Sequence, residues 1–247
     1  MTQTHPGAQG HPSQVNGILI DLYGTLIPMG HQETRVRNLA DAAKILGVAP
    51  EEFAKSWMDC IEDRCNGKLG SLEETMESLA AAQGVRPTPE NLRRAVEKRL
   101  EFSRMLLESS VPSLPGLDAL RAAGFRLAVV SDASEETPRL WANSALSSRF
   151  DTAVFSFNVG VCKPDPRMYR TALERLQLPP SRCVYVGDGG SRELTGAEAV
   201  GLSAFLYRYP DDELDSARYD PDTSWSGTRL NDLQDLLRVL PPPPRAP

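Results

Sequence analysis

The stretch "GILIDLYGTLIPMG" runs from Gly17 to Gly30 and decides the fold. Its first part is apolar up to Ile20, which predicts a short strand buried on both faces, as in a parallel sheet. The apolar run ends directly at the carboxylate of Asp21, and a glycine and a threonine soon break the pattern. A carboxylate at this position is either a turn residue or a functional group. The residues at the ends of the other predicted strands decide between these two interpretations.

Beyond residue 111 the sequence alternates between apolar strands and helical segments. Strands that alternate with helices predict a parallel sheet covered by helices on both faces. The predicted strands are FRLAVVS (125–131), DTAVFSF (151–157), RCVYVGD (182–188) and LSAFLYRY (202–209). The predicted helices are LDALRAAG (117–124), EETPRLWANSAL (135–146), DPRMYRTALERLQ (165–177), SRELTGAEAVG (191–201) and RLNDLQDLLRVL (229–240).

Residues 32–109 carry no strand signal and predict an all-helical segment. Ser71 and Glu74 form a capping-box pattern, and Thr88 followed by Pro89 is typical of a helix start. In TRVRNLADAAKILG, helical spacing predicts one buried face. That face consists of Val36, Leu39, Ala43 and Leu46. Arg35 and Arg37, just inside this segment, could reach an anionic substrate, although solvent is the more expected neighbour.

Composition limits the classes of function. The chain has 247 residues and a net charge of −6, which argues against nucleic acid as the main partner. No apolar run is long enough to span a membrane, and MTQTHPGAQGHPSQ does not resemble a secretory signal, so a cytoplasmic protein without a membrane partner is expected. Disorder is expected in residues 1–14, and a loose Pro-rich tail in 241–247.

The carboxyl ends of the predicted strands bring chemically active residues to one edge of the sheet. Asp21 ends the first strand, Ser131 and Asp132 end the second, and Asp188 follows a later one. Lys163 follows the strand at 151–157. Ligands bind at this edge of open parallel sheets. Paired carboxylates suit Mg²⁺, and a lysine with a hydroxyl suits an anionic group, which together favour phosphoryl transfer.

These residues, in this order, resemble the motifs of the haloacid dehalogenase (HAD) superfamily of hydrolases. DLYGTL resembles the first motif, VVSDAS the second, VCKPDPRMY the third and VGDGGSRELTGAEAVG the fourth. The resemblance implies a Rossmann-like three-layer α/β/α core, with a parallel sheet, at residues 15–29 and 111–240. It also implies that residues 30–110 form an all-helical C1-type cap inserted after the first strand.

The resemblance also implies a role for each matching position. Asp21 would be the nucleophile, Ser131 would hydrogen-bond the transferred group, and Lys163 would balance the charge of Asp21 and Asp188. Substrate contacts would come from Thr25, Ser131, Asp132 and Lys163. Mg²⁺ would be bound by Asp21, the backbone carbonyl of Tyr23 and Asp188, with Glu193 expected in the second shell through water.

Tyr23 departs from the phosphatase pattern, which has a second aspartate two residues after the nucleophile. A phenol is a poor general base at neutral pH, although it can donate a hydrogen bond. It could equally be a wall residue. Tyr23 and Tyr169 instead resemble the metal-independent L-2-haloacid dehalogenases of the superfamily, whereas Asp132 and Asp188 do not.

Three hypotheses follow. The first is a Mg²⁺-dependent phosphatase that acts on a small phosphorylated metabolite through an aspartyl intermediate. The second is a metal-independent L-2-haloacid dehalogenase. The third is a catalytically degenerate relative that binds a phosphate ligand or a protein, which the substitution at Tyr23 motivates. A homodimer is compatible with each.

Overall fold

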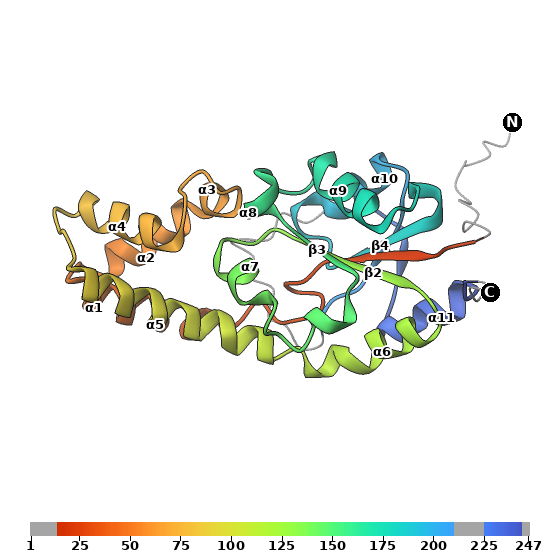
Figure 1. Ribbon diagram of the computed structural model, residues 1–247, viewed down its shortest axis with the longest axis horizontal. Coiled ribbons are helices and arrows are strands. Elements are labelled where there is room, and N and C mark those ends of the chain that lie inside the picture. Colours follow the sequence, from red (N-terminus) through yellow and green to blue (C-terminus); the bar gives the residue numbers. More distant parts are fainter. Residues whose placement is uncertain (1–13, 210–224, 244–247) are drawn as a thin grey trace, which may run out of the picture.

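The computed structural model describes residues 14–209 and 225–243 of the chain. Figure 1 shows a sheet with helices on both faces and an elongated bundle of helices extending from one end. The predicted tails lie mostly outside the described residues. Within the described residues, no helix has the length and apolar character needed to cross a membrane.

A parallel six-stranded sheet forms the centre of the fold, in the order β3-β2-β1-β4-β5-β6. β1 is central because Gly17 pairs with Arg126 on one side and with Cys183 on the other. All residues of β1 and β4 are buried, as their apolar sequences predict. The strands are β1 (Gly17–Ile20), β2 (Arg126–Ser131), β3 (Thr152–Phe155), β4 (Cys183–Gly187), β5 (Ser203–Leu206) and β6 (Thr228–Arg229).

Helices cover both faces of this sheet, so the core has three layers, as predicted (Figure 1). On one face, α6 (Leu114–Ala122) and α11 (Leu236–Val239) pack against Ile18 and Ile20. On the other, α9 (Pro166–Leu176) and α10 (Glu193–Ala199) pack against Leu19. Two short helices, α7 (Glu136–Trp141) and α8 (Ser156–Val159), follow β2 and β3.

The all-helical segment lies between β1 and β2 and is called here the helical insertion (residues 32–108). Its elements are α1 (Gln32–Leu46), α2 (Pro50–Asp59), α3 (Ile61–Cys65), α4 (Leu72–Ala82) and α5 (Pro89–Glu108). The predicted capping box of Ser71 and Glu74 starts α4, and Thr88 caps α5. The insertion has its own apolar core around Phe53 and Trp57, separate from the two faces of the sheet.

Two expectations for α1 were wrong. Val36 is 46% exposed, whereas Arg35 is buried at 5% exposure. The other predicted positions, Leu39, Ala43 and Leu46, are buried. The buried face is therefore rotated toward Arg35, and Val36 lies at its edge because α1 packs mainly along α5.

Several element ends differ from the sequence prediction. The helix expected over 135–146 ends at Trp141, and the one over 229–240 is reduced to α11 after a short 3₁₀ turn. The two-residue strand β6 carries no alternating pattern and was not predicted. The 3₁₀ helices are η1 (Val111–Ser113), η2 (Ser147–Arg149), η3 (Pro180–Arg182), η4 (Gly190–Arg192) and η5 (Leu233–Asp235).

Candidate active site

The candidate site lies at the carboxyl edge of the sheet, where β1 meets β4. Asp21 follows β1 directly, and its backbone N–H donates to the carbonyl of Val186 at 2.9 Å, so strand geometry fixes its position. The chain runs outward from β1 in opposite directions to β2 and to β4. Such a switch point is the usual ligand crevice of open parallel sheets.

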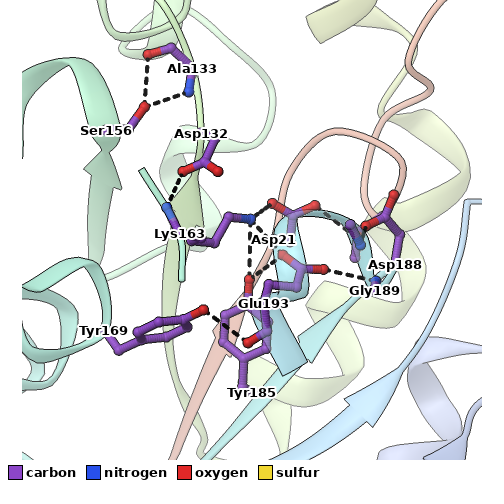
Figure 2. A network of polar contacts seen from close by, with 12 residues as sticks. Asp21, Asp132, Ala133, Ser156, Lys163, Tyr169, Tyr185, Asp188, Gly189 and Glu193 are labelled. Atoms are coloured by element: carbon purple, nitrogen blue, oxygen red, sulfur yellow. Dashed lines mark hydrogen bonds and ion pairs between the residues drawn. The ribbon is translucent and has the colours of Figure 1, made fainter. Parts of the chain in front are cut away.

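Lys163 connects the carboxylates of the site (Figure 2). Its ammonium group donates to Asp21 Oδ1 at 2.5 Å and to Glu193 Oε2 at 2.5 Å, and it lies 3.3 Å from the hydroxyl of Tyr185. Its backbone N–H donates to Asp132 Oδ1 at 2.9 Å. Burial alone would lower the pKa of Lys163, but Asp21 and Glu193 raise it well above its ordinary value.

Thr25, which the sequence analysis predicts as a substrate contact, bonds Asp21 in the structure. Its side chain is fully buried, and its hydroxyl donates to Asp21 Oδ2 at 3.1 Å. Thr25 therefore holds one carboxylate oxygen of Asp21, and Lys163 holds the other. Gly24, which directly precedes Thr25, has a φ of +80°. A Cβ on Gly24 would collide with the carboxylate of Asp188, so the turn requires glycine.

Glu193 is held by hydrogen bonds on both of its oxygens. Oε1 accepts the backbone N–H of Gly189 at 3.0 Å, and Oε2 accepts the hydroxyl of Tyr185 at 2.7 Å as well as Lys163. Tyr169 donates to its backbone carbonyl at 2.9 Å. These bonds fix the orientation of Glu193 next to Lys163.

The site holds more negative than positive charge. Burial raises the pKa of Asp21 to about 7, although Lys163 opposes the rise. Burial, with the nearby charges of Glu193 and Asp21, raises the pKa of Asp188 to about 9. Burial also raises the pKa of Asp132. Each carboxylate would ionise more easily if a further cation were present.

A divalent cation fits this arrangement. Asp21, Asp188 and Glu193 are all buried, and each offers an oxygen within 4.8 Å of the others. Hard carboxylate oxygens are the ligands that Mg²⁺ prefers, together with waters and substrate phosphate. Each of the three carboxylates already accepts at least one hydrogen bond from the protein, and each keeps lone pairs that could bind an ion.

Ser131 and Asp132 lie at the end of β2, as predicted. Ser131 Oγ is fully buried and has no hydrogen-bond partner among the described residues. Buried hydroxyls are normally paired, so Ser131 Oγ keeps an unused capacity for a hydrogen bond. Asp132 lines the cavity beside the site but is engaged by the backbone of Lys163, so it positions the lysine.

Tyr23 also lines the cavity, but its hydroxyl is hydrogen-bonded to a residue of the core domain. It forms a 2.7 Å hydrogen bond with Thr137 Oγ1 on α7. Burial raises the pKa of Tyr23 to about 12, so the phenol stays protonated throughout the physiological range. The ring packs against the apolar core, which supports the role of a wall residue over that of a general base.

The cavity has a volume of about 1070 Å³ and extends from the sheet edge to the helical insertion. Its far side is lined by Arg35, which the sequence singled out, and by three residues that the sequence analysis did not identify as part of a site: Arg64, Arg99 and Glu136. Single arginines in amphipathic helices give no signal of this kind, because only the packing of separate helices brings them together.

Two kinds of contact hold the insertion against the core next to this cavity. Ser156 at the start of α8 donates to the carbonyl of Cys65 at 2.7 Å. Glu135 accepts the backbone N–H of Leu72 at 2.7 Å, and Arg139 binds Glu73 at 3.0 Å. The cavity therefore lies between the insertion and the elements that follow β2 and β3.

Known proteins resemble this chain in sequence and in fold. A phosphoglycolate phosphatase from Nitrosospira multiformis is 31% identical over 205 residues, which cover 80% of this chain and 85% of that protein. The mouse haloacid dehalogenase-like hydrolase domain-containing protein 3 is 34% identical over 140 residues, 57% of this chain. Those residues span only about half of the mouse protein, 52% of its length.

Among solved structures, a HAD-family enzyme from Bacteroides thetaiotaomicron, crystallised as a magnesium complex, superposes with a TM-score of 0.61. The match covers 80% of this chain and 96% of that chain at 18% identity, which shows a common fold. A family model described as haloacid dehalogenase-like hydrolase matches residues 15–201, which include Asp21, Ser131, Lys163 and Asp188. The chain therefore belongs to the haloacid dehalogenase-like hydrolases.

Proposed function

We propose that the protein is a Mg²⁺-dependent phosphatase that acts on a small phosphorylated substrate through an aspartyl intermediate. The observation that carries this proposal is the buried excess of carboxylate around Asp21. Lys163 bonds both Asp21 and Glu193, and an oxygen of Asp188 lies within 4.8 Å of oxygens of these two carboxylates. Carboxylates this close favour a cation between them, so this site favours a metal-dependent chemistry. The likeness to a phosphoglycolate phosphatase supports the same conclusion.

The proposed reaction has two steps. An oxygen of Asp21 attacks the phosphorus atom, and the bond between phosphorus and the leaving oxygen breaks to give an aspartyl phosphate. Water then attacks this phosphorus, and phosphate departs with the regeneration of the Asp21 carboxylate. Mg²⁺, held by Asp21 and Asp188, would offset the charge of the phosphoryl oxygens. Thr25 and Lys163 keep Asp21 oriented, and Ser131 Oγ is available to a phosphoryl oxygen.

The geometry of Tyr23 restricts the substrates that should react well. Because its hydroxyl is bonded to Thr137 and has a pKa of about 12, it is poorly suited to protonating a leaving alkoxide. Leaving groups that need no protonation, such as the carboxylate released from an acyl phosphate, avoid this step. We therefore expect acetyl phosphate to be hydrolysed faster than an alkyl phosphate.

Tyr23→Phe should leave the hydrolysis of acetyl phosphate nearly unchanged. The substitution keeps the packed ring and removes only the hydroxyl that bonds Thr137. Its kcat and its pH–rate profile between pH 5 and 9 are compared with those of the wild type, since a group with a pKa near 12 does not titrate there. A loss of more than about a hundredfold, typical of a lost acid or base, would give Tyr23 a direct role in the chemistry.

The metal requirement has its own test. Phosphate release from acetyl phosphate and p-nitrophenyl phosphate is measured with Mg²⁺ and with EDTA. Activity should require Mg²⁺, and Mg²⁺ should raise the melting temperature of the wild type but not of Asp188→Asn, since that variant loses a predicted ligand. Asp165→Asn, a change at the N-cap of α9, is the matched control and should respond to Mg²⁺ like the wild type.

The same preparation tests the alternatives. Chloride release from L-2-chloropropionate that persists in EDTA would establish the dehalogenase instead, for which Tyr23 is the supporting residue. Absence of turnover on every compound, combined with stabilisation by phosphate, would establish a ligand-binding protein without catalysis.

A further inference from the structure

The side of the cavity formed by the helical insertion is positively charged. Arg35 of α1, Arg64 of α3 and Arg99 of α5 are 5%, 4% and 8% exposed, and all line the cavity that reaches Asp21. Glu136 on α7, 2% exposed, is the buried carboxylate that faces them. Buried arginines are rare unless an anion compensates them.

Glu136 is shared between two of these arginines. Its Oε1 lies 3.1 Å from Arg99 Nε and 3.9 Å from Arg64 Nη1. Arg64 also donates to the carbonyl of Trp57 at 3.3 Å and to Ser134 Oγ at 3.2 Å. One carboxylate cannot balance the charges of both Arg64 and Arg99, so this pair keeps an excess of positive charge.

Arg99 has unused capacity to donate hydrogen bonds. Its Nη1 atom is buried and has no hydrogen-bond partner among residues 14–209 and 225–243. Its guanidinium lies 5.5 Å from the centre of the Trp57 ring and 5.0 Å from that of Phe102, which holds the planar group in place. Burial lowers the pKa of Arg99, and Arg64 and Arg35 lower it further, although Glu136 opposes this shift.

The cavity therefore has two poles of opposite charge. Asp21, Asp132, Asp188 and Glu193 lie with Lys163 at the sheet edge, and Arg64 and Arg99 lie with Glu136 on the side of the insertion. A single phosphoryl group with Mg²⁺ would satisfy the first pole and leave the second unbalanced. A guanidinium fork binds a carboxylate or a phosphate through paired hydrogen bonds.

We propose that Arg99, together with Arg64 and Arg35, binds a second anionic group of the substrate. The substrate is then a small phosphate compound with a carboxylate or a second phosphate at its other end. This inference rests on the proposed phosphatase function for the first group, whereas the arginine site itself does not depend on it.

The arginine site is tested first without metal or turnover. Malonate is added to the wild-type protein in EDTA, where the acidic pole repels anions, and the melting temperature and heat of binding are measured. Malonate should stabilise the wild type, and the uncharged malonamide should not. Arg99→Met should bind malonate at least about tenfold more weakly, the effect of losing a charged hydrogen bond.

Two further variants keep the test decisive. Arg104→Met alters an exposed arginine of the same helix, paired with Glu97, and should bind malonate like the wild type. Arg99→Lys keeps the charge without the fork, and it should restore part of the binding if the fork holds the anion. Equal malonate binding in Arg99→Met and the wild type, or none in the wild type, would overturn the proposal.

The substrate class is tested by binding to Asp21→Asn in the presence of Mg²⁺. The ligands are propyl phosphate, 3-phosphonooxypropanoate and propane-1,3-diol bisphosphate, which differ only in the end away from the first phosphate. One of the two ligands with an anionic far end should bind at least about tenfold more tightly than propyl phosphate. The tighter of the two shows whether the second anion is a carboxylate or a phosphate. Equal binding of all three would exclude a bifunctional substrate. If malonate binding depends on Arg99 but the protein has no phosphatase activity, the arginine site is supported and only the proposed function is refuted.

Discussion

Asp21→Asn should reduce the hydrolysis of acetyl phosphate by about 10⁴-fold or more, because it removes the attacking oxygen of a covalent mechanism. The change is nearly isosteric, and Thr25 can still donate to the remaining oxygen at this position. The fold should therefore be retained. The measurement is the rate of phosphate release under saturating Mg²⁺, with circular dichroism as the check on folding.

The control for this variant is Asp118→Asn, an exposed aspartate on α6 that pairs with Arg149 far from the cavity. It should keep wild-type activity. Rapid quenching of the wild-type reaction should also yield a phosphorylated peptide that contains Asp21, and the variant should yield none. Retention of more than a few per cent of activity in Asp21→Asn would rule out Asp21 as the nucleophile.

Lys163→Met should destabilise the fold by about 3–5 kcal/mol, which is typical when one partner of a buried ion pair is removed. The side chain of Lys163 is 4% exposed and binds two buried carboxylates. Its loss leaves Asp21 and Glu193 facing each other without compensation. Urea unfolding in EDTA measures the change in the free energy of unfolding.

A second substitution identifies the cause of this loss. In Lys163→Met combined with Glu193→Gln, less charge is left unpaired, so the double variant should recover part of the stability lost in Lys163→Met. Lys55→Met removes an exposed i,i+4 ion pair with Asp59 on α2 and should change stability little. Equal losses in Lys163→Met and Lys55→Met would mean that the buried pair contributes no more than a surface pair.

The fold and the sheet edge could be predicted from sequence because both follow from local patterns. Continuous apolar runs with helices between them specify a parallel sheet, and the topology then brings strand ends together. Asp21, Lys163 and Asp188 meet for this reason, although they come from distant segments. The starts of α4 and α5 were predictable because capping residues act within one turn.

The arginine side of the cavity could not be predicted, because it depends on how helices pack. Arg64, Arg99 and Glu136 come from α3, α5 and α7, and no spacing rule links them. The role of Thr25 was also hidden, since its hydroxyl could face either the substrate or Asp21 until the turn at Gly24 was known. Val36 was misassigned because the buried face of α1 includes Arg35, so that Val36 lies at the edge of that face.

The central position of β1 has a consequence for how the chain is made. This strand leaves the ribosome first, but its two neighbours in the sheet begin at Arg126 and Cys183, after the whole helical insertion. The insertion has mainly local contacts and its own core, so it can fold while β1 still lacks both partners. During synthesis, an apolar segment that ends in the future nucleophile is therefore exposed until β2 and β4 emerge.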